Sequence, residues 1–242
     1  MMQSPTSINT YLQCPRKYYY KYIAKLPTKE NANMLMGTIT HKVLAEFVSH
    51  KDGDFSKTRL FKMLDEKWQR DKSGLLNEKH FEEVKGMLEK WHENIVRKAN
   101  RNHLCEYLQG LKAEVKLKSE EYNVCGVVDL IDEKSGSIIE YKTSSKDEMK
   151  REYKLQIGIY ALLFWEKFKR LPRKAIVHFL RHGEKETPVD DALVDETKRL
   201  CKLMKMKTMK KEIQFYPKKV GPLCKWCSGE CDFYDVCFGK TN

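Results

Sequence analysis

The sequence lacks the features that mark membrane-spanning, secreted and disordered proteins. Its longest apolar run, Ile157 to Trp165, falls well short of the roughly 20 residues that a helix needs to cross a bilayer. Residues 1–5 have neither a charged start nor an apolar core, so we expect no signal peptide, no membrane association and a cytoplasmic location. A hydrophobic fraction of 41% is that of a globular protein and excludes a disordered chain.

Three further absences narrow the range of functions. The chain has no Gly-x-x-x-x-Gly-Lys-Ser/Thr phosphate loop, so we expect no helicase motor. It has no internal repeat and no low-complexity linker, so we expect residues 1–242 to form one domain. Acidic residues are in the minority, with 34 Asp and Glu against 46 Lys and Arg. The resulting net charge of +12 attracts polyanions, of which nucleic acid is the usual one.

The hydrophobic pattern changes at about residue 111. Before it, apolar residues recur at helical spacing, which predicts a capped N-terminal helix and helices over residues 36–48, 55–70 and 81–101. After it, we expect strands over residues 111–118, 122–132, 137–143 and 175–180, and helices over residues 151–169 and 190–212. The order predicts an α/β core (111–212) with N-terminal helices (1–50), an inserted helical lobe (51–110) and a cysteine-rich tail (213–242).

Asp129, Glu140 and Lys142 are the candidate catalytic residues. The pattern Glu-x-Lys recurs elsewhere in the chain, so the pattern alone does not identify a catalytic site. The expected position of Glu140 and Lys142 in the fold distinguishes them from the other instances. Glu140 and Lys142 lie two apart on a predicted strand and therefore project from one face. A tight turn between Glu133 and Gly136 would place Asp129 opposite Glu140, with Cβ atoms about 5 Å apart.

Two carboxylates that close repel each other unless a cation lies between them. A hard divalent ion such as Mg²⁺ or Mn²⁺, bound through oxygen, is the natural ligand of this pair, with Lys142 beside it to orient the attacking water. The alternative is a surface hairpin with an ordinary ladder of charges. The apolar residues around both acids favour a buried sheet and hence the metal site.

Five of the eight cysteines predict a metal centre. Cys14 lies near one end of the chain, and Cys224, Cys227, Cys231 and Cys237 crowd the other. In a reducing compartment, thiols grouped in this way are metal ligands rather than disulfides. A four-cysteine zinc site would need no help from Cys14, whereas an iron–sulfur cluster would recruit Cys14 and leave one local cysteine spare. The remaining thiols, Cys105, Cys125 and Cys201, are expected to be small core residues.

Together these features resemble the RecB-like branch of the PD-(D/E)xK nuclease superfamily. The likeness is closest to its iron–sulfur members, which include CRISPR-adaptation exonucleases and the nuclease domains of recombination helicases. Residues 7–20, with Cys14-Pro15-Arg16, resemble the opening cysteine helix, and residues 37–41, ending at His41, resemble the histidine motif. Asp129, Glu140 and Lys142 match the catalytic motif, Gln156 and Tyr160 match Gln-x-x-x-Tyr, and the terminal cysteines match the closing cluster motif.

The resemblance implies a restriction-endonuclease-like core, in which helices flank a mixed central sheet. It implies a Mg²⁺- or Mn²⁺-dependent deoxyribonuclease that prefers single strands and works as an exonuclease, with His41 and the Tyr141 carbonyl joining Asp129 and Glu140 at the metal. Gln156 and Tyr160 would contact DNA. The aromatic and basic residues from Tyr18 to Lys25, together with the helical lobe, would guide a single strand by stacking and charge. Protein partners would come from repair, recombination, viral replication or CRISPR adaptation.

The resemblance also implies a 4Fe–4S cluster held by Cys14, Cys224, Cys227 and Cys237. The family closes with Cys-x-x-Cys followed by a third cysteine, and here residues 228–231 are inserted between the two halves. Cys231 is therefore either a spare thiol or a replacement for Cys224 or Cys227. The alternative function is a non-catalytic nucleic-acid-binding protein whose cysteines hold zinc.

Overall fold

A five-stranded mixed sheet with helices on both faces forms the centre of the protein. The computed structural model describes residues 2–50, 52–100, 103–226 and 229–239. The strands of the sheet are β1 (Leu111–Ser119), β2 (Val124–Asp132), β3 (Ser137–Lys142), β4 (Lys174–Phe179) and β5 (Gly183–Thr187). They lie in the order β1-β2-β3-β4-β5, and only the β3–β4 pair is parallel. This is the α/β arrangement that the sequence predicted.

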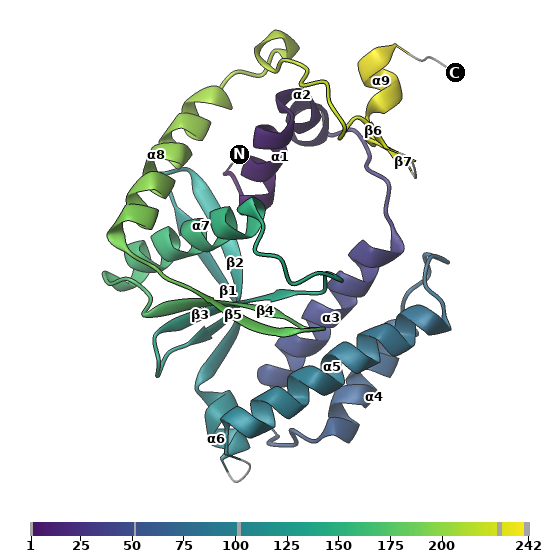
Figure 1. Cartoon of the computed structure of the whole chain (residues 1–242), viewed down its shortest axis with the longest axis vertical. Helices are drawn as coiled ribbons and strands as arrows, with labels where there is room; N and C mark the ends of the chain where they lie inside the picture. Colours follow the sequence, from purple (N-terminus) through teal and green to yellow (C-terminus); the bar gives the residue numbers. More distant parts are fainter. Residues whose placement is uncertain (1, 51, 101–102, 227–228, 240–242) are drawn as a thin grey trace.

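Helices precede, interrupt and follow the sheet (Figure 1). Before it lie α1 (Pro5–Gln13), α2 (Pro15–Tyr18), the π-helix η1 (Tyr19–Ile23), α3 (Ala32–Val48), α4 (Lys57–Trp68), α5 (Glu78–Lys98) and α6 (Leu104–Gln109). The crossover from β3 to β4 is α7 (Arg151–Phe168), and α8 (Asp191–Lys207) follows β5. The tail contains the 3₁₀ turn η2 (Ile213–Phe215), a small hairpin of β6 (Lys225–Trp226) and β7 (Gly229–Glu230), and α9 (Tyr234–Phe238).

Local chemistry explains where the first helix begins. Ser4 and Ser7 form a reciprocal capping box, in which each side-chain oxygen accepts from the backbone N–H of the other at 2.8 and 3.1 Å. Pro5 occupies the first helical position, where its missing N–H costs nothing. The helix therefore starts where the sequence predicted it.

The sheet separates two hydrophobic cores. One lies between the sheet and α1, α7 and α8, and includes Ile8, Val128, Ile159 and Phe164. The other lies under α3, α4 and α5 and is built around Trp91. None of the described helices is long and apolar enough to cross a membrane. The predicted helical lobe corresponds to α4, α5 and α6.

The structure corrects three expectations of local structure. The last predicted helix, residues 190–212, ends at Lys207, where the Thr208 hydroxyl donates to the Met204 carbonyl. Strand β5 was not predicted, because its sequence Gly-Glu-Lys-Glu-Thr is polar and belongs to an edge strand. Of the cysteines expected in the core, Cys201 is buried, whereas Cys105 is exposed and Cys125 is only half-buried.

Candidate active site

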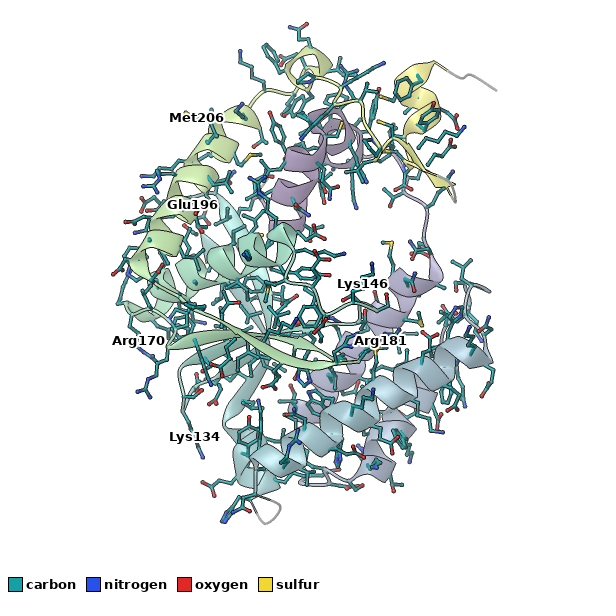
Figure 2. All side chains as sticks on the ribbon, in the orientation of Figure 1. Lys134, Lys146, Arg170, Arg181, Glu196 and Met206 are labelled. Carbon is teal, nitrogen blue, oxygen red and sulfur yellow. The ribbon has the colours of Figure 1, made fainter. Side chains whose placement is uncertain are left out.

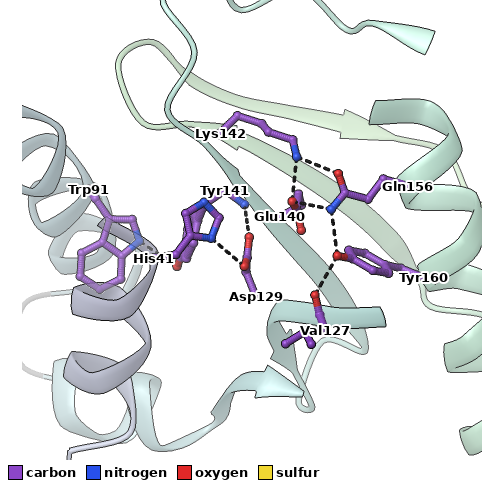
Figure 3. A network of polar contacts seen from close by, with 9 residues as sticks. All are labelled: His41, Trp91, Val127, Asp129, Glu140, Tyr141, Lys142, Gln156 and Tyr160. Atoms are coloured by element: carbon purple, nitrogen blue, oxygen red, sulfur yellow. Dashed lines mark hydrogen bonds and ion pairs between the residues drawn. The ribbon is translucent and has the colours of Figure 1, made fainter. Parts of the chain in front are cut away.

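The hairpin of β2 and β3 brings Asp129 and Glu140 to one place. The pairing of Leu130 with Ile139 and of Asp132 with Ser137 confirms the predicted register. The β2–β3 ladder ends at Leu130, one residue short of Asp129. Its Oδ2 accepts from the backbone N–H of Tyr141 at 2.7 Å (Figure 3). The two acids therefore lie side by side where the hairpin opens.

His41 reaches Asp129 from α3. Its Nδ1 lies 2.9 Å from Asp129 Oδ1, so both carboxylate oxygens of Asp129 are bonded, one to a side chain and one to the backbone. The two residues are 88 positions apart in the chain. The structure thus brings the histidine of α3 to Asp129 of β2.

Lys142 and Gln156 form a second network around Glu140 (Figure 3). Lys142 Nζ donates to Glu140 Oε1 at 2.8 Å and to Gln156 Oε1 at 2.7 Å. Gln156 Nε2 lies 2.7 Å from the same oxygen of Glu140. One carboxylate oxygen is therefore shared by an ammonium and an amide, one from β3 and the other from α7.

Tyr160 links this network to the backbone of β2. Its hydroxyl accepts from Gln156 Nε2 at 2.8 Å and donates to the Val127 carbonyl at 2.7 Å. The ring is 4% exposed, and burial raises its pKa, so the hydroxyl stays protonated. Tyr160 positions Gln156 in this structure, and a direct DNA contact by either residue stays a prediction.

Burial and mutual repulsion separate the two acids electrostatically. Burial and the charge of Asp129 raise the pKa of Glu140 to about 7. Burial acts on Asp129 as well, but the hydrogen bond and charge of His41 outweigh it and hold the Asp129 pKa below its ordinary value. The same contact holds the pKa of His41 above its ordinary value despite the opposing effect of burial. Asp129 therefore ionises at lower pH than Glu140.

A hard cation fits this set of donors. Glu140 Oε2 is buried and has no hydrogen-bond partner among the described residues. An unpartnered buried carboxylate oxygen is costly in a protein interior, and a divalent cation bound by Asp129 and Glu140 would satisfy it. No group of three metal-binding His, Cys, Asp or Glu side chains is present in the described ranges. His41 bonds Asp129 Oδ1 and Lys142 bonds Glu140 Oε1, and the second oxygen of Glu140 keeps no partner.

Two supporting residues were missed in the sequence. Trp91 of α5 donates its indole N–H to the Tyr141 hydroxyl at 2.9 Å, on the opposite face of β3 from Glu140. Arg181, after β4, donates Nε to the Thr143 carbonyl at 3.1 Å, directly after Lys142. Both contacts fix the end of β3. In the sequence, Trp91 is indistinguishable from an ordinary core residue of an amphipathic helix. No pattern in the sequence links Arg181 to residue 143.

Two tyrosines of the segment after Cys14 are buried against the tail of the chain. Tyr18 and Tyr20 are 1% and 6% exposed. Tyr18 stacks on Tyr216 of the tail at a centroid distance of 5.9 Å, and Tyr20 packs against Phe233 at 5.6 Å. These two rings join the two ends of the chain and are not available to stack on a nucleic-acid strand, whereas Tyr19 and Tyr22 are only half-buried.

Four cysteines from the two ends line one cavity of about 140 Å³: Cys14, Cys224, Cys231 and Cys237. Arg16 ties the same ends together, since its backbone N–H donates to the Pro217 carbonyl and its Nε to the Tyr216 carbonyl at 2.7 Å. Cys227, a predicted ligand, lies outside the described residues. The tail and the first helices meet beside each other, away from the sheet (Figure 1).

Comparisons with known proteins bear on the family and the fold. The family profile described as the PD-(D/E)XK nuclease superfamily matches residues 3–238. No curated protein matches the chain. A solved structure from Eubacterium rectale, named as a candidate exonuclease, shares 11% identity over 94% of this chain and 87% of its own, with a TM-score of 0.55. The structure of SSO0001 shares 21% identity over 86% of this chain and 98% of its own, but its TM-score of 0.37 is too low to compare folds.

Proposed function

Because this chain belongs to the PD-(D/E)XK nuclease superfamily, we propose that it is a Mg²⁺- or Mn²⁺-dependent deoxyribonuclease whose active site is formed by Asp129, Glu140 and Lys142. The family itself makes the protein a phosphodiester hydrolase acting on nucleic acid. The observation that carries the site assignment is the buried, unpartnered oxygen of Glu140 beside the ionised Asp129.

Asp129 and Glu140 would hold the metal, with His41 and the Tyr141 carbonyl completing the protein ligands. A divalent cation supplies Lewis-acid activation of water and neutralises phosphate charge when it is bound there. The Tyr141 N–H keeps Asp129 oriented through its 2.7 Å hydrogen bond. Trp91 bonds the Tyr141 hydroxyl and Arg181 bonds the Thr143 carbonyl, so the end of β3 is fixed before a metal arrives.

Lys142 would orient the attacking water and interact with the scissile phosphate. Gln156 holds its ammonium 2.8 Å from Glu140, so the positive charge lies beside the carboxylate that would bind the metal. The face of the Tyr153 ring, 4.7 Å from Lys142 Nζ, limits the directions in which the side chain can turn. Gln156 and Tyr160 then serve as positioning residues.

The substrate we propose is DNA, degraded from an end with a preference for single strands. A net charge of +12 favours a polyanionic substrate. The exonuclease mode is supported by the RecB-like motif order and by the name of the Eubacterium rectale neighbour. The pathway we propose is repair, recombination, viral replication or CRISPR adaptation. We further propose that residues 1–242 act as one nuclease domain.

The cysteine cavity would hold a structural 4Fe–4S cluster. Cys14, Cys224 and Cys237 are three proposed ligands, and Cys227 is the fourth, with Cys231 as its alternative because it lines the same cavity. Four thiolates are the usual ligand set of such a cluster.

Anaerobic purification should give a brown protein containing iron and labile sulfide. Colourless protein loaded with zinc would contradict the cluster, and separate Cys227→Ser and Cys231→Ser variants should lose iron in only one case.

The activity is tested on end-labelled single- and double-stranded DNA with Mg²⁺ and with Mn²⁺. Lys142→Ala should abolish degradation. The matched control is Lys116→Ala, which removes a lysine from another Glu-x-Lys pattern on the exposed side of β1. Unchanged degradation by Lys142→Ala would contradict the assignment of that lysine. DNA binding without degradation by the wild type in either metal would favour a non-catalytic role.

A further inference from the structure

Tyr153 lies in the first turn of α7, where its ring faces the proposed catalytic lysine. The Lys142 ammonium lies 4.7 Å from the centroid of this ring, within the distance at which an aromatic face attracts a cation. The Lys142 side chain is only 17% exposed, so little water competes for the ammonium and the contact belongs to the stronger class of cation–π interactions. Lys150 lies 6.0 Å from the same ring but is exposed, which makes its contact the weaker of the two.

The sheet holds the Tyr153 ring in place. The ring packs against Phe179 of β4, with the two centroids 6.0 Å apart and the ring planes at 58°. Phe179 is fully buried and is the residue that pairs with Lys142 in the parallel register of β3 and β4. The Tyr153 ring therefore lies over Lys142 and the residue beside it on the neighbouring strand, and its position is set by the core.

Tyr153 also belongs to the stripe of α7 that faces the site. Gln156 and Tyr160 follow it three and seven positions later, a spacing that places the three side chains on one face of the helix. Gln156 accepts from the Lys142 ammonium at 2.7 Å, and Tyr160 bonds Gln156 at 2.8 Å. One helix face thus supplies both the amide and the aromatic ring that contact Lys142.

The partners of Lys142 differ in their effect on its charge. Glu140 is a carboxylate that compensates the charge of the ammonium, and it is also a proposed metal ligand. Gln156 and the ring of Tyr153 are neutral, so they hold the ammonium and leave its charge available to a phosphate. The ring is therefore suited to keep the lysine at the site without neutralising it.

We propose that Tyr153 is a positioning residue of the nuclease, whose aromatic face holds the Lys142 ammonium where the scissile phosphate binds. The inference rests on the proposed function, because it concerns the part that Lys142 plays in the reaction. The face of the ring carries the role and the hydroxyl does not. An aromatic replacement should therefore preserve the role, and an aliphatic one should lose it.

Steady-state degradation of end-labelled single-stranded DNA tests the ring. Tyr153→Leu should lower kcat by about tenfold and leave KM within about twofold, because the ring acts on Lys142 and not on the bound strand. Tyr153→Phe keeps the aromatic face and should retain the kcat of the wild type. A residue that merely stabilised the fold would not separate kcat from KM in this way.

The matched control is Trp165→Leu at the other end of α7. It removes a similar contact, because the Lys198 ammonium lies 4.2 Å from the centroid of the half-buried Trp165 ring. Trp165 is about 18 Å along the helix from Tyr153. Figure 2 shows Lys146, in the loop that leads into α7, on the side of α3, and Arg170, just after α7, on the opposite side of the molecule. We expect the kcat of Trp165→Leu to equal that of the wild type.

A double-mutant cycle in urea unfolding measures the contact without catalysis. Tyr153→Leu and Lys142→Met are made singly and together. The unfolding constant of the double variant should change by about fivefold less than the product of the two single changes, since the contact can be lost only once. This cycle reports on the ring and the ammonium whether or not the protein degrades DNA.

The outcomes distinguish this inference from the proposed function. A wild type that degrades no DNA with either metal contradicts the proposed function before any variant is compared. An active wild type whose kcat is matched by Tyr153→Leu overturns only the role of the ring, and so does a cycle without coupling. Equal losses in Tyr153→Phe and Tyr153→Leu would also overturn it, because the hydroxyl would then carry the effect. A tenfold loss that the phenylalanine restores, together with coupling to Lys142, supports it.

Discussion

Gly126 lies directly against the ring of Tyr160. A Cβ atom at position 126 would come within 2.7 Å of Tyr160 Cε1, closer than real side-chain contacts allow. The backbone carbonyl of Val127, the next residue in β2, accepts a hydrogen bond from the Tyr160 hydroxyl. The absence of a side chain at position 126 therefore lets α7 approach the sheet closely enough for Gln156 to reach Glu140.

Gly126→Ala should displace Tyr160 and, through it, Gln156. We expect nuclease activity to fall by about 10- to 100-fold, because small displacements of positioning groups are costly to catalysis. Measuring kcat on labelled single-stranded DNA checks this. The control is Gly86→Ala on α5, where an added Cβ meets no atom within 4 Å and activity should be unchanged. Wild-type activity in Gly126→Ala would show that Tyr160 does not position Gln156.

Glu140→Gln should abolish activity and stabilise the fold at pH 7. The amide removes a buried charge that Asp129 repels, and its N–H can donate to Asp129 where the carboxylate oxygen had no partner. We expect the free energy of unfolding to rise by about 1 kcal/mol. Urea unfolding measures it, with Glu186→Gln on the exposed edge strand as a control. A loss of stability would mean that the pair with Lys142 outweighs the repulsion.

Trp91 and Tyr141 should be energetically coupled. Either Trp91→Phe or Tyr141→Phe leaves a buried donor or acceptor without its partner, at a cost of about 2 kcal/mol each. The double variant loses both groups together, so its cost should be about 1 kcal/mol less than the sum of the two single costs. A double-mutant cycle by chemical unfolding measures the difference. Strict additivity would show that the hydrogen bond contributes nothing to stability.

His178 should make the fold sensitive to acid. Burial, with Lys98 nearby, outweighs the charge of Glu184 and lowers the pKa of His178 to about 4 from 6.5. The folded state therefore favours the neutral ring, and its contribution is fully present above pH 6.5 and is lost as the pH falls towards 4. Between pH 6.5 and pH 4 the free energy of unfolding should fall by about 3 kcal/mol more in the wild type than in His178→Gln. Unfolding at several pH values tests this, and His182→Gln, an exposed histidine, should behave as the wild type.

The sequence predicted the hairpin and its register because both depend on local patterns. A turn over residues 133–136 and apolar residues on both flanking strands leave one way to pair β2 with β3, and that pairing is observed. The contact of His41 with Asp129 could be placed only by the family motif, because no local pattern spans 88 residues. Arg181 and Trp91 were out of reach for the same reason, since each binds a backbone or side-chain group from a distant element.

The distances along the chain within the site have a consequence for folding. The bond from Asp129 to the Tyr141 backbone spans only 12 residues, whereas the bond from His41 to Asp129 spans 88. Loop closure makes contacts between nearby residues faster to form, so the hairpin that carries both acids can assemble early. The histidine arrives only when α3 docks on the sheet. An incompletely folded chain therefore brings the two acids together before it gains the histidine that contacts Asp129.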